Sequence, residues 1–506
     1  MVSTPDAPLA PVDTVTVYGG AGPSAVDLDS VRRAAALIAG AAADLRSAAV
    51  RCLEAGGDLD VFGAGRTEAT SWVTGEAGAQ ARALEAAAQD AARGLVTRAD
   101  LCELLGRRLL RAAGSYEEAE STAERVVGAL VTAGTFGIGA AVGGLGWAGL
   151  AGSAAVGGAE MAGRMVGGTV TGGALSPVTG QVWAAATRGL APYSDEAFTG
   201  LGGGVALAQP GLAQGRSGVP GGAGALAHVA RELPVLGNDD RGLRVARLGA
   251  GDFADGAVPA WSDTGARSVQ EAVARIDSLY PEQGGAPPAT VAIQKVTGAD
   301  GTVSWTVLIP GTQSALPAEH PWDGRTDVEL IAGQADGGTV AVERALADSG
   351  AGPDEPVTLV GHSLGGIAAA ALVSRASFTE RYRVGGLVTA GAPTGLLVTP
   401  PGVPVLHLET PEELVSHADG RSAAENPRTR DRVTVVRSLR DSADASDRAA
   451  SGDVAQAHAV ATHVRTLDLA VALGDPRVSQ VADRIGTRLD GRAVRTVFYR
   501  AERADP

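Results

Sequence analysis

The sequence predicts an α/β protein in which a mostly parallel sheet is flanked by helices and preceded by an all-α helical bundle. The chain has 506 residues, of which 45% are hydrophobic and 20% charged, so a large core and roughly two to four domains are expected. Helical patterns rich in Ala, Leu and Arg fill the first 125 residues. From about residue 240, short apolar runs alternate with helical patterns, as in an α/β sheet.

The chain is acidic, with 42 basic and 57 acidic residues and a formal net charge of −15. Lys295 is its single lysine. A phosphate-binding surface needs clustered Lys and Arg side chains, and no such cluster stands out in the sequence. We therefore expect no nucleic-acid partner.

Residues 1–125 are expected to form the helical bundle. Apolar residues recur at helical spacing from Asp27 to about Gly57, and further helices are expected at 66–95 and 97–127. Short connections between long helices favour an antiparallel arrangement. This part of the chain shows little other local chemistry.

Two features bear on the compartment in which the chain works. The first 25 residues form a polar leader without the basic and apolar regions of a secretory signal peptide, so we expect a cytoplasmic location or a specialised export route. Cys52 and Cys102 lack metal-ligand spacing and fall in the expected helices. They are either buried thiols or one disulfide across a helical hairpin, and only the second requires an oxidising compartment.

Residues 126–235 are expected to form a Gly- and Ala-rich apolar segment followed by a linker. Val126–Ala159 holds no charged residue and is long enough to cross a bilayer, but its many glycines lower its helix propensity. We favour a packed helical hairpin between domains over membrane association or a loose linker, although small residues four apart also permit close packing in a membrane. Residues 200–235, rich in Gly and Pro, are expected to be the linker.

Residues 236–506 carry the alternation of strands and helices. A helix is expected first, then two strands joined at Asp300-Gly301, a typical hairpin turn. The expected strands are 290–296, 303–309, 357–360, 384–389, 403–408, 432–436 and 493–499, and the expected helices are 268–279, 340–347, 366–374 and 471–490.

The segment from Gly361 to Gly365 matches Gly-x-Ser-x-Gly, with Ser363 at its centre. A buried strand precedes the motif and a helix with small residues follows it, which is the strand–turn–helix context that a nucleophilic serine requires. Glycines at both ends of the motif permit the sharp turn that leaves the serine in a strained backbone conformation. Ser363 is therefore the candidate nucleophile.

A serine nucleophile needs backbone N–H groups that stabilise the oxyanion of the intermediate. One donor is expected at Leu364, at the start of the following helix. The other is expected at Thr312 or Gln313, which follow the strand 303–309 and a Pro-Gly turn.

The general base and the acid should follow the serine along the chain, the acid first. Among seven histidines, His458 and His463 come after the last central strand, and His458 is preferred because His463 lies about one turn further into a helix. His362 is set aside because a neighbour of the nucleophile points away from it. The loop after strand 403–408 offers the acids, with Glu413 first, Glu412 as the alternative, and then Glu409 and Asp419.

No His, Cys or Asp cluster shows metal-ligand spacing, so neither a metal nor another cofactor is expected.

Residues of about 240–475 resemble α/β-hydrolases of the lipase and esterase kind. The resemblance rests on Gly-His-Ser-Leu-Gly-Gly at the serine, Pro-Gly-Thr-Gln at 310–313, Thr-Ala-Gly-Ala-Pro-Thr-Gly at 389–395 and the acidic loop. Alignment on the family's acid-x-Val-Pro loop makes Glu413 the acid, although Glu replaces the commoner Asp and Ser416 replaces Pro. The resemblance implies an α/β-hydrolase fold and a serine hydrolase that cleaves a small-molecule or lipid ester through an acyl-enzyme, without a cofactor.

The N-terminal region resembles, more weakly, the helical substrates of actinobacterial type VII (ESX) secretion. Residues 116–120, Tyr-Glu-Glu-Ala-Glu, match the Tyr-x-x-x-acid export signal. The Trp-x-Gly turn of that group is not intact, because Trp72 and Gly75 are one residue too far apart. This resemblance implies a type VII-like export route. It also implies an alternative function, that of an exported envelope or effector protein whose helical half binds a secretion partner or membrane, with a degenerate or secondary hydrolase domain.

Overall fold

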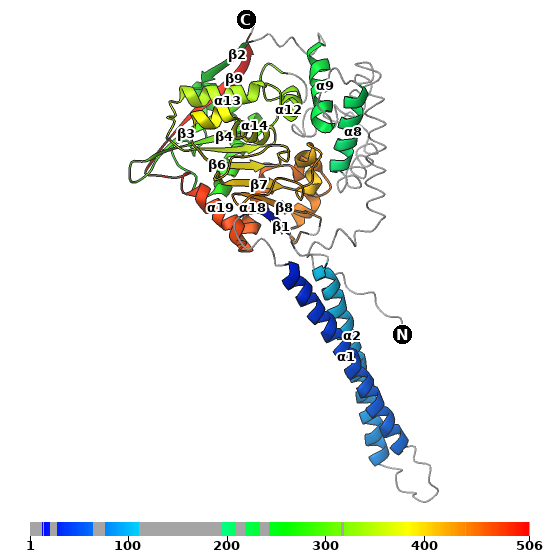
Figure 1. Ribbon diagram of the computed structural model, residues 1–506. Helices are drawn as coiled ribbons and strands as arrows, with labels where there is room; N and C mark the ends of the chain where they lie inside the picture. Colours follow the sequence, from blue (N-terminus) through cyan, green and yellow to red (C-terminus); the bar gives the residue numbers. More distant parts are fainter. Residues whose placement is uncertain are drawn as a thin grey trace, which may run out of the picture. The chain divides into compact units, whose positions relative to one another are not determined.

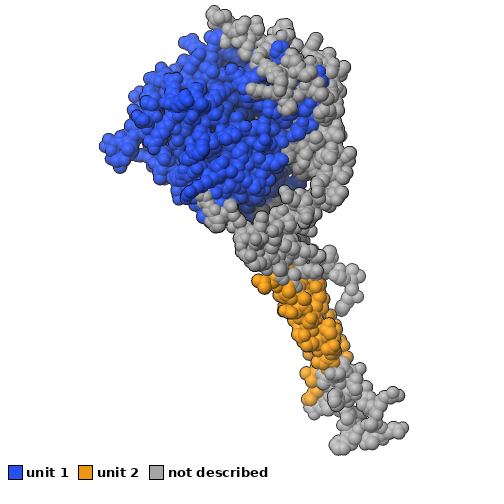
Figure 2. All heavy atoms as spheres, in the orientation of Figure 1, with its two compact units in different colours: residues 1–22, 127–506 blue, residues 23–126 orange. Residues whose placement is uncertain are grey.

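The computed structural model describes residues 13, 15–20, 28–63, 76–110, 194–208, 218–232, 242–314, 318–440 and 442–504. The chain divides into two compact units, which Figure 2 colours separately. One unit is Pro23–Val126, and the other consists of Met1–Gly22 and Val127–Pro506. The expected Tyr116–Glu120 signal, the Trp72–Gly75 segment and the apolar stretch 126–175 lie outside the described residues.

The larger unit is built on a nine-stranded mixed sheet with the order β1-β8-β7-β6-β5-β4-β3-β9-β2. The strands β4 to β8 run parallel to one another, while β1, β2, β3 and β9 each pair antiparallel with their neighbours. The strands are β1 Val15–Gly19, β2 Gly242–Arg247, β3 Thr290–Thr297, β4 Val303–Ile309, β5 Val357–His362, β6 Val384–Ala390, β7 Val405–Glu409, β8 Arg432–Arg437 and β9 Ala493–Ala504.

Helices cover both faces of this sheet (Figure 1). Within the described residues of the larger unit, the helices are α8 Ser194–Ala208, α9 Gly218–Glu232, α10 Val269–Arg275, α11 Pro281–Gly284, α12 Gly324–Ile331, α13 Gly337–Asp348, α14 Leu364–Val373, α15 Ala376–Arg381, α16 Ala445–Ala450, α17 Val454–Ala457, α18 Val460–Ala472 and α19 Pro476–Gly486. Short 3₁₀ turns are η5 Ala250–Asp252, η6 Ala254–Gly256, η7 Ile276–Leu279, η8 Pro411–Glu413 and η9 Val415–His417.

Two hydrophobic cores lie on opposite faces of the sheet, because successive strand residues point to opposite sides. On one face α13 and α14 pack over residues such as Val307 and Leu359. On the other face α10, α18 and α19 pack over residues such as Leu308 and Val388. The parallel strands are buried on both sides, as a sheet covered by two helical layers requires.

The expected α/β class is confirmed in this unit, and each strand expected from the sequence is present. The short edge strands β1 and β2 were not expected, because neither shows a long apolar run. The single helix expected at 471–490 is wrong, since α18 ends at Ala472 and α19 begins at Pro476. Gly474 has a φ of +73° between them, and Pro476 occupies the first turn of α19, so the chain turns here.

The described residues within 200–235 include helical structure where a linker was expected. Helices α8 and α9 pack against each other through glycines. A Cβ on Gly222 would lie 2.6 Å from Cα of Gly202, so only glycine permits this close crossing. The glycines that signalled a linker are therefore the contact surface of two helices.

The smaller unit contains two long helices, α1 Leu28–Gly63 and α2 Glu76–Leu110, which pack side by side (Figure 1). The expected break near residue 96 is wrong, because α2 continues through it and the Thr97 hydroxyl donates to the Arg93 carbonyl within the same helix. The remainder of the helix expected at 97–127 lies outside the described residues, so a bundle of more than two helices stays a prediction.

Cys52 and Cys102 are half-buried free thiols on α1 and α2, so the alternative of a disulfide between these helices is wrong. In the part of the chain that the structure describes, no helix combines the length and the apolar character needed to cross a membrane.

Candidate active site

Ser363 lies in a sharp turn between β5 and α14. Its φ of 54° and ψ of −125° place it outside the regions that L residues favour, as expected for a strained strand-to-helix turn. Two glycines make the turn sterically possible. A Cβ on Gly361 would clash with the carbonyl of Gly365, and a Cβ on Gly365 would clash with the carbonyl of Ile309.

The sheet register brings the loops of the candidate site to one edge. Ile309 pairs with Gly361, and Gly361 pairs with Thr389, so β4, β5 and β6 end at the same level. The Ser363 N–H donates to the carbonyl of Ala390, the last residue of β6, at 2.9 Å. The turn at Ser363 is therefore fixed against the end of the neighbouring strand.

His458 and Glu413 form a buried pair at this edge. Nδ1 of His458 lies 2.6 Å from Oε2 of Glu413, and both residues are at most 4% exposed. Gly391, directly after Ala390, leaves the space for the pair, since a Cβ there would lie 2.7 Å from Nδ1 of His458. The pair and Ser363 thus converge at the ends of β5 and β6.

The Glu413 carboxylate is held in its charged form. Burial alone would raise its pKa, but the charge interaction with His463 and the hydrogen bonds from His458 and His463 outweigh burial and hold the pKa well below its usual range. Its other oxygen, Oε1, accepts the N–H of Thr410 at 3.0 Å. Because an ionised carboxylate only accepts, Nδ1 of His458 donates this hydrogen bond, and in the neutral imidazole Nε2 then keeps its lone pair.

The other candidate acids point elsewhere. Glu412 accepts hydrogen bonds from the Ser438 hydroxyl at 2.6 Å and the Leu439 N–H at 3.2 Å, so it holds the loop after β8 rather than a histidine. Glu409 accepts from Asn426 at 2.7 Å, and Asp419 accepts the Gly395 N–H at 2.6 Å. Burial raises the pKa of Glu409 well above its usual value.

The expected oxyanion donors separate into free and engaged groups. The N–H of Gln313 donates to the Trp322 carbonyl at 2.8 Å, which removes it from the candidate set. Among the described residues, neither Thr312 N–H nor Leu364 N–H has a hydrogen-bond acceptor, and Leu364 opens α14, whose first N–H groups have no intrahelical partner. Gly311 keeps the two loops together, since a Cβ there would lie 2.6 Å from Cβ of Ser363.

Sequence reasoning missed the roles of His362 and Tyr280. Nε2 of His362 lies 2.7 Å from the His458 carbonyl, and its Nδ1 lies 2.6 Å from the Tyr280 hydroxyl, which accepts the Gly311 N–H at 2.7 Å. A carbonyl only accepts, so His362 carries its proton on Nε2 and the Tyr280 hydroxyl donates to Nδ1. Burial lowers the pKa of His362, which keeps it neutral. This chain of hydrogen bonds connects Gly311, in the loop that carries Thr312, to the backbone of His458.

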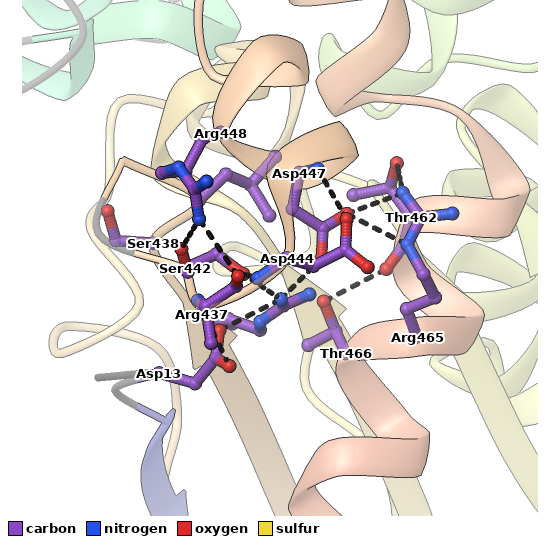
Figure 3. A network of polar contacts seen from close by, with 12 residues as sticks. Asp13, Arg437, Ser438, Ser442, Asp444, Asp447, Arg448, Thr462, Arg465 and Thr466 are labelled. Carbon is purple, nitrogen blue, oxygen red and sulfur yellow. Dashed lines mark hydrogen bonds and ion pairs between the residues drawn. The ribbon is translucent and has the colours of Figure 1, made fainter. Parts of the chain in front are cut away.

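A buried ionic network holds the segment that leads to His458 (Figure 3). Arg437, at the end of β8, pairs with Asp447 of α16 and donates to Asp13 at 3.0 Å and to Ser442 at 2.8 Å. Arg465 of α18 pairs with the same Asp447 at 2.6 Å. The network therefore connects the elements on both sides of His458 to the sheet.

His362, His458 and His463 bring ring nitrogens within 4.8 Å of one another, which raises the question of a metal site. The hydrogen bonds do not fit one. Both nitrogens of His362, Nδ1 of His458 and Nε2 of His463 already have partners, so three ligand atoms cannot be assembled without breaking a hydrogen bond of His362. The cluster fits a proton-handling site instead.

Comparisons with known proteins add no relative. No family model, no curated protein and no solved structure matches the chain. The structure defines an α/β protein with a mixed nine-stranded sheet. Its candidate site consists of Ser363, the His458–Glu413 pair and the backbone N–H groups of Thr312 and Leu364.

Proposed function

We propose that this chain is a serine hydrolase of the α/β-hydrolase fold that cleaves carboxylic esters through an acyl-enzyme. The observation that carries the proposal is the convergence of a strained serine with a buried His–Glu pair at the carboxyl ends of adjacent parallel strands. The position of Ser363 directly after β5 and of the pair beside Gly391, directly after β6, supports the proposal. The resemblance of the sequence around Ser363 to lipases and esterases supports the same reading.

In the proposed acylation step, Oγ of Ser363 attacks the ester carbonyl carbon while Nε2 of His458 takes the hydroxyl proton. Glu413 holds the tautomer that leaves Nε2 unprotonated, and its charge stabilises the imidazolium that forms. The N–H groups of Leu364 and Thr312 stabilise the negative oxygen. The C–O bond to the alcohol then breaks, and His458 returns the proton to the leaving alkoxide.

In the proposed deacylation step, His458 takes a proton from water, and the resulting hydroxide attacks the acyl-enzyme carbonyl. The tetrahedral intermediate collapses, the acid product leaves, and the proton returns to Ser363. An alcohol in place of water would make the same site an acyltransferase. Hydrolysis is the simpler reading because it requires no second binding site.

The test is hydrolysis of one short-chain and one long-chain p-nitrophenyl ester by the full chain. Ser363→Ala should lower kcat/KM by at least about 10³-fold, as expected when the nucleophile of a triad is removed. Ser374→Ala, at the other end of α14 with its hydroxyl bonded to the Ala370 carbonyl, is the matched control and should change the rate less than about twofold. The ratio of the two esters separates an esterase from a lipase.

Two adjacent glutamates give a second matched pair in the same assay. Glu413→Gln should lower kcat by roughly 10³-fold or more, because the amide disturbs the His458 tautomer. Glu412→Gln should stay within about threefold of wild type, because Glu412 binds the loop after β8. The proposal is wrong if wild type hydrolyses neither ester, or if Ser363→Ala hydrolyses them as fast as wild type.

A further inference from the structure

Glu413 has a second histidine partner beside His458. His463, on the first turn of α18, places Nε2 3.1 Å from Oε2 of Glu413. This is the same oxygen that lies 2.6 Å from Nδ1 of His458. Both His463 and Glu413 are fully buried, so water does not compete for these bonds.

The directions of these hydrogen bonds follow from the carboxylate. An ionised carboxylate has no proton to donate, so Nδ1 of His458 and Nε2 of His463 both donate to Oε2. His463 therefore carries its proton on Nε2. Its Nδ1 is buried and has no hydrogen-bond partner among the described residues.

A histidine that served packing alone would not be arranged in this way. A buried polar atom without a partner costs stability, so His463 is held at a cost that its packing does not explain. Its one side-chain hydrogen bond in the described part of the chain goes to the acid. An apolar residue would fill the same place on α18 without leaving Nδ1 unsatisfied.

We propose that His463 is a positioning residue for Glu413. Its Nε2–H holds Oε2 in place and partly neutralises the negative charge there, which limits how strongly Glu413 stabilises protonated His458. This inference rests on the proposed function. It assigns His463 no contact with substrate. The expected consequence is that protonated His458 gives up its proton readily in both acylation and deacylation.

The other titratable groups around this cluster are His362 from the turn before α14, Glu409 from β7 and Tyr280, which acts through His362. Burial lowers the pKa of His362 and raises those of Glu409 and Tyr280. Burial therefore favours the neutral form of all three. The change in the net charge of the cluster with pH is therefore set by Glu413 and its two histidine partners.

The first test compares His463→Leu with His463→Gln in the kcat/KM pH profile of the full chain. Leucine removes the donor, so Glu413 stabilises the imidazolium more strongly, and the acid limb should move to higher pH by about half a unit or more. Plateau kcat should fall roughly fivefold to tenfold, the effect of losing one positioning hydrogen bond. In His463→Gln, the side-chain amide Nε2 is expected to reach the same place and donate to Oε2 of Glu413, so the kcat/KM pH profile should stay near that of wild type.

An unmoved acid limb in His463→Leu would overturn the inference, and so would a glutamine variant that shifts as far as the leucine variant. A second measurement does not depend on activity. Long-range ¹H–¹⁵N spectra of histidine-labelled wild type should show a proton on Nε2 of His463. A His463 ring that is protonated on Nδ1 and not on Nε2 overturns the inference even if the chain proves to be no hydrolase, whereas loss of Ser363-dependent hydrolysis counts against the proposed function only.

Discussion

Glu412 and Glu413 are neighbours in the sequence with different surroundings. Both are buried, yet Glu413 faces two histidines while Glu412 turns to Ser438 and Leu439. Leu414, directly after them, has a φ of +63°, a conformation that non-glycine residues rarely adopt. This turn ends the 3₁₀ segment η8 and fixes which of the two carboxylates reaches His458.

At the residue scale, the sequence predicts the position of a candidate residue in the fold best where a local pattern determines it. Ser363 and Leu364 follow from a motif whose glycines dictate the turn, and chain order places the acid and the base after them. His362 could not be predicted in its observed role. Its ring lies 4.6 Å from that of His458, and this contact depends on how two segments 96 residues apart fold together.

Asp327 on α12 gives a pH-dependent prediction. Burial raises its pKa to about 7, although the Thr312 hydroxyl donates to it at 2.7 Å. The unfolded chain releases this proton near pH 4, so between about pH 4 and 7 the folded state binds more protons and stability falls as pH rises. Asp327→Asn should therefore have a higher Tm than wild type at pH 8, and a smaller advantage at pH 5.

Calorimetry of both proteins at pH 5, 6, 7 and 8 checks this. The excess of the Asp327→Asn Tm over the wild-type Tm should grow as the pH rises. A difference that is constant or that shrinks with pH would contradict it.

At the scale of elements, the strand least evident in the sequence supports the candidate site. Strand β1 pairs antiparallel with β8 along its whole length, from Val15 opposite Arg437 to Gly19 opposite Val433. Val15 and Val17 pack on the same core as α18. Asp13, just before β1, joins the network of Arg437 and Asp447 that anchors α16. The polar leader therefore contributes a strand beside β8, which lies more than 400 residues later in the sequence.

Deletion of residues 1–20 tests this role. The deletion exposes the edge of β8 and removes one carboxylate from a buried guanidinium, so the Tm of the larger unit should fall by roughly 5 °C or more. Deletion of residues 1–12, which keeps Asp13 and β1, is the matched control and should lower Tm less than deletion of residues 1–20. Equal values for the two deletions in calorimetry would show that β1 is dispensable.

Across the whole molecule, the larger unit follows from its sequence more closely than the smaller one. Its buried strands are continuous apolar runs bounded by turn residues, and such a pattern can be recognised from the local sequence alone. The crossing of α8 and α9 was mistaken for a linker, because glycine signals both a loop and a close helix contact. Composition alone does not separate these two uses.

The helical unit has a composition that favours contact with other surfaces. Among the side chains that the structure describes in this unit, the buried ones are small, namely Ala42, Ala49, Ala92 and Ala99. Its large apolar side chains are among the most exposed of the described chain, namely Leu37, Val50, Leu53, Leu84, Val96, Leu101 and Leu105. The expectation that this half binds a secretion partner or a membrane stays a prediction.

The most direct test of the central claim is covalent labelling of the full chain with a fluorophosphonate, mapped by mass spectrometry. An activated serine attacks phosphorus, forms an O–P bond and expels fluoride. The account predicts one adduct per chain on the peptide that contains Ser363, no adduct in Ser363→Ala and much slower labelling in Glu413→Gln. Wild type that remains unlabelled, or a label that persists in Ser363→Ala, would contradict it.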